Sequence, residues 1–487
     1  MIISSAFFPG FHRAGLGRKP TSAQLRLALQ TRKLDGLCLA HLETLLGNAL
    51  PSWLRTFKAE KGLNSRKRTF TPILTFWAFL SQVFDPDSSC RRALCRVQAL
   101  CAAKDITLIS DCTGAYCKAR ARLCARMLIG VLRHVTEAVA MAAGDFGSQG
   151  RLLVMDGTVL TLPDSDANRA VYSYASGQKP GCGFPQMHLL GLFDLRTGAW
   201  LRVVKSNTRR HDSFLAWKLL GFLRAGDTLI ADRAFCSYAF IAACQQRGVH
   251  ILMRLHQARE VNMRKGKCLG KGDRLQTWSK PVQRPKNMPA ARYAAMPATL
   301  KLRIVATQIE VRGHRPEPMY LATTLTDARA HSSEQIAALY LRRWNVELFF
   351  DDIKTSQNMD MLRCQSPGMV ARELLMHMIA HNLVRLLMVQ ADKQRPAAEE
   401  GRLSFKGTID RINQWHCTLW GCRSAKQARE RYGELLRLIA GDVVRPRPGR
   451  REPRVVKRRR DSYKLMTQPR ATMRRLPEPP KHLTKAA

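Results

Sequence analysis

Long apolar runs are absent from this sequence of 487 residues. No stretch of about eighteen consecutive apolar residues occurs, although a helix that crosses a bilayer needs roughly that length. The first residues, MIISSAFFPGFHRAG, are too short and too interrupted to form a secretory signal peptide. We therefore expect an intracellular protein that is not embedded in a membrane.

The sequence also lacks any C-x-x-C pair among its fourteen cysteines. The pairs Cys112 with Cys117 and Cys417 with Cys422 have the wrong spacing for a zinc site, and neither has a matching second half. Because disulfides persist only in oxidising compartments, an intracellular chain should keep these thiols reduced. We expect neither a zinc site nor a disulfide framework.

Acidic residues are scarce, with 37 Asp and Glu against 80 Lys and Arg, and the formal net charge is +43. This imbalance is too large for an enzyme of neutral small molecules and is typical of a protein that binds a polyanion. Since the sequence offers no membrane segment, nucleic acid is the leading partner.

Strand signals are few in residues 1–145, which are helical in pattern. Residues 22–48 begin at a polar cap and end near a glycine, and residues 71–84 form an apolar run that stops before a proline. Two further runs, 88–106 and 114–139, interleave basic with apolar residues. The region is either a helical DNA-binding domain or an ordinary bundle whose lysines and arginines are merely solvated.

The pattern then changes to strands that alternate with helices, which predicts an α/β domain over residues 146–365. RLLVMDGTVLTLP places a short apolar strand directly before Asp156, and DTLIADRAF places another before Asp232. An open α/β sheet carries its chemistry at such strand ends. Alone, Asp156 could merely shape a turn with Gly157, and Asp232 could pair with Arg233.

Residues 332–356 are predicted to form one long helix with an unusual polar face. At helical spacing, Tyr340, Arg343, Glu347 and Lys354 fall within roughly 60° of one another. Apolar residues flank this stripe on both sides, so we expect most of the helix to be buried. A buried carboxylate between two cations is costly unless metal ions or phosphates complete the site. The alternative is a solvated face held by i,i+4 ion pairs.

The spacing Y-x2-R-x3-E-x6-K of these four residues resembles the signature of the insertion-sequence-four family of bacterial DDE transposases. The DGT and DRAF motifs precede it in the order and settings of that family. The resemblance covers roughly residues 70–440 and implies an α/β catalytic core with the ribonuclease-H-like fold. It names Glu347 rather than Asp351 as the third acid, and we interpret Asp351 as an i,i+3 partner of Lys354.

The resemblance also implies a role for each residue of the site. Asp156, Asp232 and Glu347 would be the catalytic acids and would hold two Mg²⁺ ions, with Asp156 bridging both; Mn²⁺ could substitute. Arg343 and Lys354 are cations, so they cannot ligate a metal and would instead grip DNA phosphates near the scissile bond. Further DNA contacts are expected from Tyr340, Arg233 and Trp278.

The segment between Asp232 and Glu347 is far longer than one strand and one helix require. Strand-like runs predict a β insertion at about residues 256–325, and the resembling family carries a largely β insertion at this point. Trp278 lies within it and would stack on a base flipped from the cleaved end, as an aromatic residue does in hairpin-forming relatives. The alternative is a tryptophan that only packs in a small sheet.

Residues 366–442 are predicted to form a helical C-terminal region that packs on the catalytic core. Between Arg445 and Arg460 nine of sixteen residues are basic, and only Glu452 is acidic. Such a run is too charged and too rich in proline to fold alone. We expect residues 443–487 to be a disordered basic arm that binds phosphates, or else a solubilising tail.

These observations predict a cut-and-paste transposase of the bacterial cytoplasm, associated with the nucleoid. It would bind terminal inverted repeats as a homodimer, cleave the ends with magnesium and join the 3′-hydroxyls to target DNA. One alternative is a ribonuclease-H-fold nuclease that cuts without strand transfer. Another is a non-catalytic DNA-binding protein descended from a transposase, against which the presence of all three acids argues.

Overall fold

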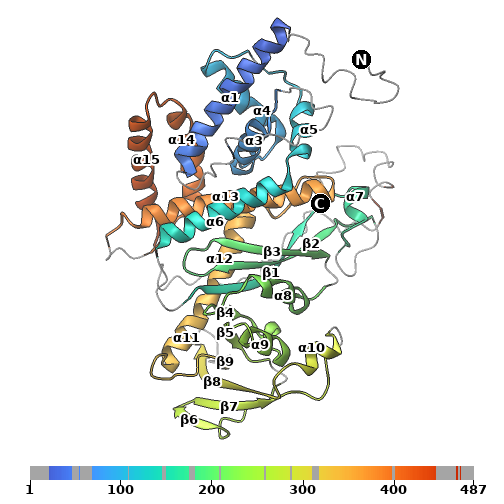
Figure 1. The fold of residues 1–487 in the computed structure, drawn as a ribbon, viewed down its shortest axis with the longest axis vertical. Helices are drawn as coiled ribbons and strands as arrows, with labels where there is room; N and C mark the ends of the chain where they lie inside the picture. The colour runs from blue at the N-terminus through green and yellow to red at the C-terminus, as the bar shows by residue number, and fades with distance from the viewer. Residues whose placement is uncertain are drawn as a thin grey trace, which may run out of the picture. The chain divides into compact units, whose positions relative to one another are not determined.

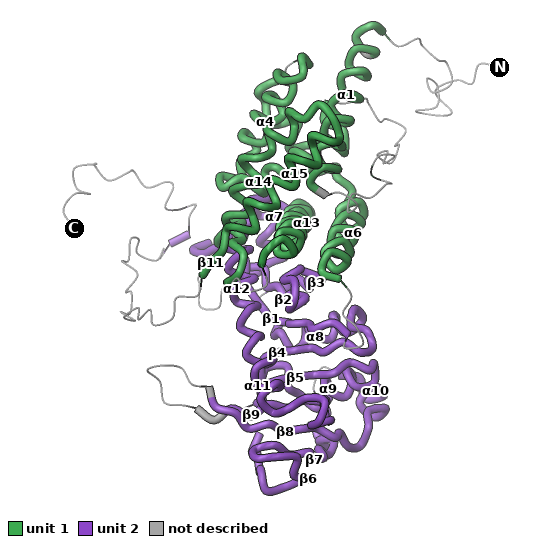
Figure 2. Tube along the Cα trace, turned by 90° about the vertical axis from the view of Figure 1, so that its left-hand side faces the viewer, with its two compact units in different colours: residues 1–145, 355–358, 368–446 green, residues 146–354, 359–367, 447–487 purple. Residues whose placement is uncertain are grey.

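The computed structural model describes the following residues: 21–46, 54, 69–107, 109–144, 150–174, 181–207, 210–256, 259–285, 288–309, 317–396, 401–445, 468–469 and 472. The chain forms two compact units, which Figure 2 shows in different colours and which are described separately below. Unit 1 comprises residues 1–145, 355–358 and 368–446, and unit 2 comprises residues 146–354, 359–367 and 447–487.

The units differ from the predicted boundaries in one respect. The helical regions predicted at 1–145 and 366–442 fall together in unit 1, so the chain leaves this unit and returns to it. The predicted catalytic region 146–365 falls almost wholly in unit 2. Most of the predicted basic arm, 443–487, lies outside the described residues.

Unit 1 is helical in its described residues, as Figure 1 shows. Its helices are α1 (Ser22–Leu46), α3 (Pro72–Phe84), α4 (Cys90–Ala103), α5 (Gly114–Arg122), α6 (Ala125–Ala143), α13 (Pro367–Asp392), α14 (Phe405–Trp420) and α15 (Ala425–Ala440). Two short strands, β10 (Arg402–Leu403) and β11 (Val443–Val444), pair antiparallel. The late helix α13 is tied to the early helix α6, because Asn382 Nδ2 donates to Thr136 Oγ1 at 2.9 Å.

Helix ends in unit 1 follow from local sequence chemistry. In α3, Pro72 occupies the first turn, where its missing N–H is not needed. The Thr71 hydroxyl accepts the Leu74 amide at 3.1 Å and so satisfies one of the free donors at the helix start. The helix stops at Phe84, before Asp85 in extended conformation. The predicted run 71–84 is therefore found as a helix.

Among the described residues, one helix, α13, is long and apolar enough to cross a membrane by length and composition alone. Within the structure, however, 83 % of the window that meets this test is buried against other parts of the protein. The same burial is found in helices at the centre of a packed bundle, so the length of α13 is weak evidence for a membrane span.

In its described residues, unit 2 has one mixed sheet of nine strands in the order β3-β2-β1-β4-β5-β9-β8-β7-β6. The strands β1, β4 and β5 are parallel to one another, and the remaining neighbours pair antiparallel. Their bounds are β1 (Leu152–Thr161), β2 (Gln186–Asp194), β3 (Trp200–Asn207), β4 (Thr228–Ala231), β5 (His250–Arg254), β6 (Lys267–Gly270), β7 (Asp273–Ser279), β8 (Thr299–Ile309) and β9 (Glu317–Thr323).

Strands β6 to β9 lie within the predicted β insertion, and they do not form a sheet of their own. Antiparallel pairing of β9 with β5 joins them to the central strands, so the insertion extends the same sheet. The hairpins β6–β7 and β8–β9 then complete its far edge.

Helices cover both faces of the sheet (Figure 1). One face packs against α8 (Asp212–Leu219) and α9 (Tyr238–Gln245) through a large apolar core that includes Met155 of β1 and Ala231 of β4. Because side chains alternate along a strand, the residues next to these two face the other side. On that side α11 (Ser333–Leu341) contacts β5 and β8, and α12 (Asn345–Asp351) contacts β1.

Candidate active site

Asp156 and Asp232 each come one residue after a pair of residues that face each other in two parallel strands. In the β1–β4 ladder Met155 pairs with Ala231, so the next residue on each strand is one of the two predicted acids. Met155 and Ala231 both point into the core with α8 and α9. Side chains alternate along a strand, so both aspartates face the opposite side of the sheet. The sheet therefore brings these two acids together.

Each aspartate also bonds to the backbone amide that follows it. Asp156 Oδ1 accepts the Gly157 amide at 2.8 Å. Asp232 Oδ1 accepts the Arg233 amide at 2.7 Å and thereby caps the short 3-10 helix η4 (Arg233–Phe235). These bonds fix each carboxylate relative to its own strand end, and each bond uses only one of the two carboxylate oxygens. The bond to the next amide therefore occupies one oxygen of each carboxylate, and the second oxygen, Oδ2, can bind another group.

The electrostatic surroundings of Asp156 favour a cation. Burial raises the pKa of the Asp156 carboxyl above its ordinary value, and the nearby charges of Asp232 and Asp212 raise it further. The Gly157 amide and the guanidinium of Arg343 act in the opposite direction. Arg343 Nη1 lies 3.5 Å from Asp156 Oδ2, which is longer than a good charge-assisted hydrogen bond. The pair of acids is thus only loosely neutralised.

Arg343 and Tyr340 form the second half of this cluster. Arg343 is 8 % exposed and Tyr340 is 2 % exposed. Burial raises the pKa of the Tyr340 hydroxyl to about 12, so the hydroxyl remains a hydrogen-bond donor at neutral pH. The guanidinium carbon lies 5.8 Å from the ring centre of Tyr340 and 5.3 Å from that of Trp344. Arg343 Nε is buried and finds no hydrogen-bond partner among the described residues.

The segment that carries these side chains is helical throughout, but it is not the single regular helix that the sequence predicted. α11 is followed by a 3-10 turn, η5 (Arg342–Trp344), then by α12 and a π-helical turn, η6 (Asp352–Ser356). A 3-10 turn advances three residues per turn and a π turn more than four. The regular spacing of 3.6 residues per turn therefore does not hold through the whole segment.

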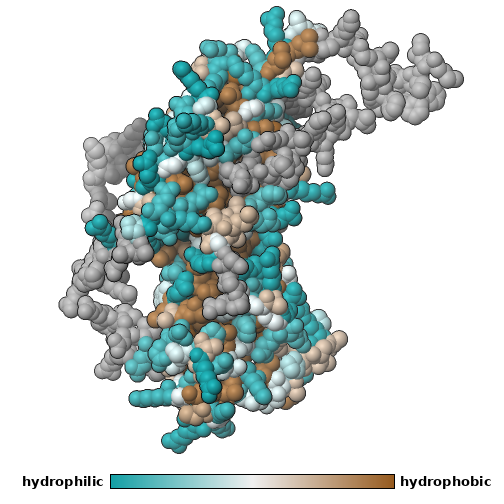
Figure 3. All heavy atoms as spheres, turned by 60° about the vertical axis from the view of Figure 1, so that its left-hand side comes forward, coloured by the Kyte–Doolittle hydropathy of each residue, from teal (hydrophilic) through white to brown (hydrophobic). Residues whose placement is uncertain are grey.

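The burial of this segment differs from the prediction as well. Val346, Phe350 and Ile353 are buried as expected. Trp344 is 49 % exposed, and the two leucines spaced around it, Leu341 and Leu348, are 43 % and 38 % exposed. Figure 3 shows that hydrophobic residues reach the surface among mainly hydrophilic ones on one face of the protein. One flank of the predicted stripe is thus open to solvent.

Glu347 and Lys354 lie further along the same segment. Glu347 is exposed on α12, the helix that contacts β1, which is the strand of Asp156. Lys354 is half-buried, and its Nζ lies 3.8 Å from Asp360 Oδ1. Among the described residues, no three His, Cys, Asp or Glu side chains come close enough together to hold a metal ion. The structure therefore places Asp156 beside Asp232, and the role of Glu347 as the third acid stays a prediction.

The donor set nevertheless fits a hard divalent cation. Asp156 and Asp232 offer carboxylate oxygens, which are the ligands that Mg²⁺ and Mn²⁺ prefer. Their partial burial makes a bound cation favourable, because burial is the main cause of the raised pKa of Asp156 and a cation would offset it. The exposed side chain of Glu347 is on the helix that packs on the same strand.

Trp278 lies in a setting that favours the packing interpretation. It is 7 % exposed and belongs to the apolar core that α8 and α9 share with the sheet. The guanidinium of Arg259 lies 3.7 Å from its ring centre and covers one ring face. Base stacking by Trp278 stays a prediction, and it would require Arg259 to move aside.

One group near the site was missed in the sequence. His188 on β2 and Asp212 at the start of α8 form an ion pair, with Nε2 and Oδ1 2.7 Å apart, and the carboxylate raises the pKa of His188. The Asp212 carboxylate lies against the backbone of Gly157: a Cβ at that position would come within 2.5 Å of Asp212 Oδ2. The glycine after Asp156 is therefore required for packing. No spacing rule links residues so far apart in the chain.

The chain is similar to several known proteins. Residues 147–383 match the family described as "Transposase DDE domain". The chain is 26 % identical over 319 residues to "Transposase InsG for insertion sequence element IS4" of Escherichia coli (strain K12), a match that covers 64 % of this chain and 69 % of that protein. A cryo-EM structure of the piggyBac transposase synaptic complex with hairpin DNA matches with a TM-score of 0.41 and 11 % identity, over 87 % of this chain and 86 % of that chain.

The family match spans both strands that carry the paired aspartates and the helical segment with Arg343 and Glu347. Together with the similarity to the transposase of an insertion-sequence-four element, it confirms the resemblance predicted from the DGT and DRAF motifs. Residues 147–383 therefore match the DDE domain of transposases, and the chain is similar to the transposase of an insertion-sequence-four element.

Proposed function

We propose that this protein cuts DNA at the ends of its own element and joins the freed 3′-hydroxyls to target DNA, using Asp156 and Asp232 as its central acids. The observation that carries the proposal is the register of β1 with β4, which sets two partly buried carboxylates side by side on one face of the sheet. The order of the strands and their mixed pairing support a ribonuclease-H-like core around this point.

Divalent cations, Mg²⁺ or Mn²⁺, would be held by Asp156 and Asp232, with Glu347 as the third ligand from α12. When bound, they supply activation of the attacking oxygen and neutralisation of the leaving oxygen at the phosphorus. The protein's own part is to hold both aspartates in a fixed orientation. The bonds from the Gly157 and Arg233 amides do this, because each fixes one carboxylate oxygen.

Arg343 is the residue best suited to bind the scissile phosphate. Its contact with Asp156 is long, so Nη1 is available to a phosphate oxygen. Tyr340 remains protonated at neutral pH and would donate to another phosphate oxygen. Lys354 and Arg233 would contribute further positive charge near the site.

The basic composition supports extended contact with DNA beyond the cleavage site. A net charge of +43 favours binding to phosphates through counterion release. In this proposal the helices of residues 1–145 read the terminal inverted repeats, and the arm 443–487 adds sequence-independent binding. Two copies of the chain would hold the two ends together at the nucleoid.

The proposal is tested by replacing the acids one at a time. Asp156→Ala, Asp232→Ala and Glu347→Ala should each reduce Mg²⁺-dependent cleavage of an element end to background, while binding to that end persists. Asp166→Ala is the matched control, because Asp166 is a fully solvated acid of the same unit with a side chain 96 % exposed. Near wild-type cleavage by any of the three variants would remove that residue from the site.

A nuclease that cuts without strand transfer is separated by its product. Pre-cleaved ends incubated with a supercoiled target and Mg²⁺ should give covalently joined DNA, since a 3′-hydroxyl can replace water as the nucleophile. Cleavage without joined product over the same time course would favour the nuclease. Specific binding without either reaction would favour a non-catalytic DNA-binding protein.

A further inference from the structure

In the described part of the sheet, β1 loses one of its two neighbours where it passes Asp156. Its pairing with β4 ends at Met155, and the next bridge on that side is at Thr161. On the other side, the partner of Asp156 on β2 is Gly191, and the next residue along β1 is Gly157. Glycine has no side chain to pack, and it restricts the backbone least. This acid therefore lies on a stretch of backbone that needs support from elsewhere.

The first residue of α8, Asp212, supports this stretch with its side chain. A Cβ at Gly157 would lie 2.5 Å from Asp212 Oδ2, 2.7 Å from Oδ1 and 2.8 Å from Cγ. All three distances are too short for a real Cβ, so the whole carboxylate group lies against the Gly157 backbone. The amide of Gly157 in turn donates to Asp156 Oδ1 at 2.8 Å. A line of contacts therefore runs from Asp212 through one peptide unit to Asp156.

The Asp212 carboxylate is itself held by His188 of β2, whose Nε2 lies 2.7 Å from Asp212 Oδ1. The strand register explains this contact. His188 pairs with Val159, and Leu190 pairs with Gly157. Residues two apart on a strand face the same side of the sheet, and Leu190 belongs to the apolar core that packs against α8. His188 therefore reaches Asp212 on the same face where Asp212 meets Gly157.

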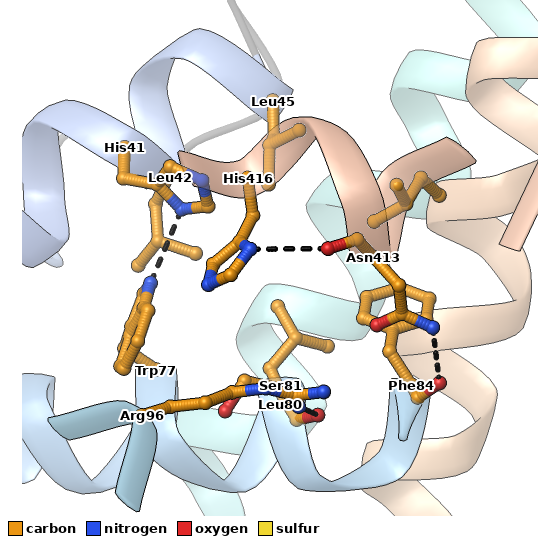
Figure 4. A pocket seen from close by; sticks show the side chains of 11 residues that line it. His41, Leu42, Leu45, Trp77, Leu80, Ser81, Phe84, Arg96, Asn413 and His416 are labelled. Atoms are coloured by element: carbon orange, nitrogen blue, oxygen red, sulfur yellow. Dashed lines mark hydrogen bonds between the residues drawn. The ribbon is translucent and has the colours of Figure 1, made fainter. Parts of the chain in front are cut away.

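The ring of His188 carries both of its hydrogens in this arrangement. Nδ1 donates to the carbonyl oxygen of Arg210 at 3.0 Å, and a carbonyl, like the carboxylate at Nε2, can only accept a hydrogen bond. The bond to Asp212 is the main cause that raises the pKa of His188. The buried His41 of unit 1 has the opposite state: Trp77 Nε1 donates to His41 Nδ1 at 3.1 Å (Figure 4), and burial lowers the pKa of His41 to about 3. His188 is therefore a positive charge beside Asp212.

This positive charge makes a carboxylate tolerable so close to the acid it supports. Burial is the main cause of the raised pKa of Asp156, and the charge of Asp212 adds to it. An unpaired Asp212 would repel the Asp156 carboxylate. With His188 in place, the supporting pair carries little net charge.

We propose that His188 and Asp212 are positioning residues for Asp156. They fix the backbone of Gly157 and thereby the direction of the Asp156 carboxylate, and neither touches the divalent cation or DNA. This role rests on the proposed function, in which Asp156 binds that cation. Residues that orient a metal ligand without touching the metal typically change metal affinity or activity by about 10–100-fold when they are replaced.

The first experiment measures Mn²⁺ binding to the full-length protein by electron paramagnetic resonance, which requires no cleavage. Asp212→Ala should bind Mn²⁺ about tenfold more weakly than the wild type, because the support of Gly157 is lost. His188→Ala should have a smaller effect, since Asp212 remains. His188→Gln should recover part of that loss, because its amide can still donate to Asp212.

The dependence of cleavage on Mg²⁺ separates positioning from a general loss of structure. In Asp212→Ala the half-saturating Mg²⁺ concentration should rise about tenfold, while the rate at saturating Mg²⁺ and the binding of an element end change little. A merely structural role would instead lower the amount of folded protein and reduce the rate equally at every Mg²⁺ concentration. That second result would overturn the proposal.

Asp166→Ala is the matched control, because Asp166 is the first residue of α7 (Asp166–Arg169), as Asp212 is of α8. Both changes remove an acid that the start of a helix favours, but the Asp166 side chain is 96 % exposed. This control should bind Mn²⁺ as the wild type does. Wild-type Mn²⁺ affinity in Asp212→Ala, with weaker binding in Asp156→Ala, would overturn the positioning role and leave the proposed function standing. Unchanged affinity in Asp156→Ala would overturn both.

A double-mutant cycle tests the contact between Asp212 and Gly157. Gly157→Ala alone places a Cβ against the Asp212 carboxylate and should weaken Mn²⁺ binding. In Asp212→Ala that space is vacated, so adding Gly157→Ala should cost little further affinity. Additive losses would overturn the proposal, since the two residues would then act separately. If circular dichroism shows that Asp212→Ala does not fold, Asp212→Ser replaces it in the cycle, because serine also vacates the space and remains polar at the helix start.

Discussion

Two of the arginine–aspartate pairs in unit 2 differ sharply in geometry. Arg303 on β8 is 0 % exposed and Asp273 on β7 is 3 % exposed. They are joined by several bonds, among them Nη2 to Oδ2 at 2.6 Å, and Arg303 Nη1 also donates to the His331 carbonyl at 2.6 Å. Arg343 and Asp156 share one contact of 3.5 Å, and the side chain of Asp156 is 27 % exposed.

The difference separates a structural pair from one that can exchange partners. In a buried arginine–aspartate pair, every hydrogen-bond donor and acceptor can be bonded. Such a pair holds the strands or helices that carry it in place, and separating its two side chains costs much free energy. The Arg303 pair fastens two strands of the insertion to the loop before α11, and so supports the helix that carries Tyr340. The Arg343 pair leaves a donor and part of a carboxylate unengaged. Only the second pair has capacity for a phosphate or a cation.

The largest loss of stability should come from breaking the buried pair of Arg303 and Asp273. Asp273→Ala leaves the buried guanidinium of Arg303 without its carboxylate, and it should lower the free energy of unfolding by about 3–5 kcal/mol. Chemical denaturation of the full-length protein measures this loss. Cleavage per folded molecule at low temperature should stay near that of the wild type, because Asp273 is not part of the candidate site.

The control for this change is Asp166→Ala, which removes an exposed partner of Arg169 in the same unit. Its unfolding midpoint should be unchanged, since solvent screens exposed pairs. If both variants had the same stability, the buried pair of Arg303 and Asp273 would contribute no more to stability than an exposed pair.

Removing Arg343 from its loose pair with Asp156 should reduce DNA cleavage and leave the stability of the protein almost unchanged. Arg343→Ala removes a charge-assisted phosphate contact, so we expect cleavage of a pre-nicked end to fall by about tenfold to a hundredfold. Arg343→Lys should recover only part of the loss, because a point charge cannot reproduce the planar fork. Melting temperature measured on the same samples should shift little.

Arg342→Ala provides the matched comparison, because Arg342 is the exposed neighbour in the same 3-10 turn. It should cleave like the wild type. A large loss of stability in Arg343→Ala with normal cleavage at low temperature would mean that Arg343 only neutralises Asp156, and the two pairs would then be alike.

A smaller effect should follow from moving Asp156 without changing any charge. In Gly157→Ala the new Cβ meets the Asp212 carboxylate, which His188 holds in place. Such overpacking typically costs about 1–3 kcal/mol, and the displaced strand should reduce cleavage about tenfold. Gly221→Ala is the control, because a Cβ there meets nothing within 4 Å. Equal cleavage by the two variants would show that the position of Asp156 tolerates the shift.

The strands and the paired acids were predictable because their signals are local. A short apolar run followed by an acid predicts a buried strand with a polar end, and this identified Asp156 and Asp232 before any register was known. The cap and the proline at the start of α3 predicted its beginning for the same reason. In each case the residues that decide the structure are neighbours in the chain.

Other features depend on geometry that a local sequence pattern does not contain. Helical spacing predicted one regular helix over residues 332–356, and the structure interrupts it with a 3-10 turn and a π turn. Asp212 was not identified from the sequence because its contact arises only when α8 packs against Gly157. The joining of the insertion to the central sheet likewise depends on β9 pairing with β5, far apart in sequence. Tertiary contacts decide the last two.

The single continuous sheet also has a consequence for self-association. Nine strands share only two open edges, and unpaired edges are where chains aggregate by adding strands. At one edge, β6 has only four residues, begins with Lys267, and is kinked by a register shift against β7. At the other edge, β3 carries Arg202 and Lys205. Short length, irregular pairing and positive charge oppose strand addition, so this highly basic protein should resist fibrous aggregation through its sheet.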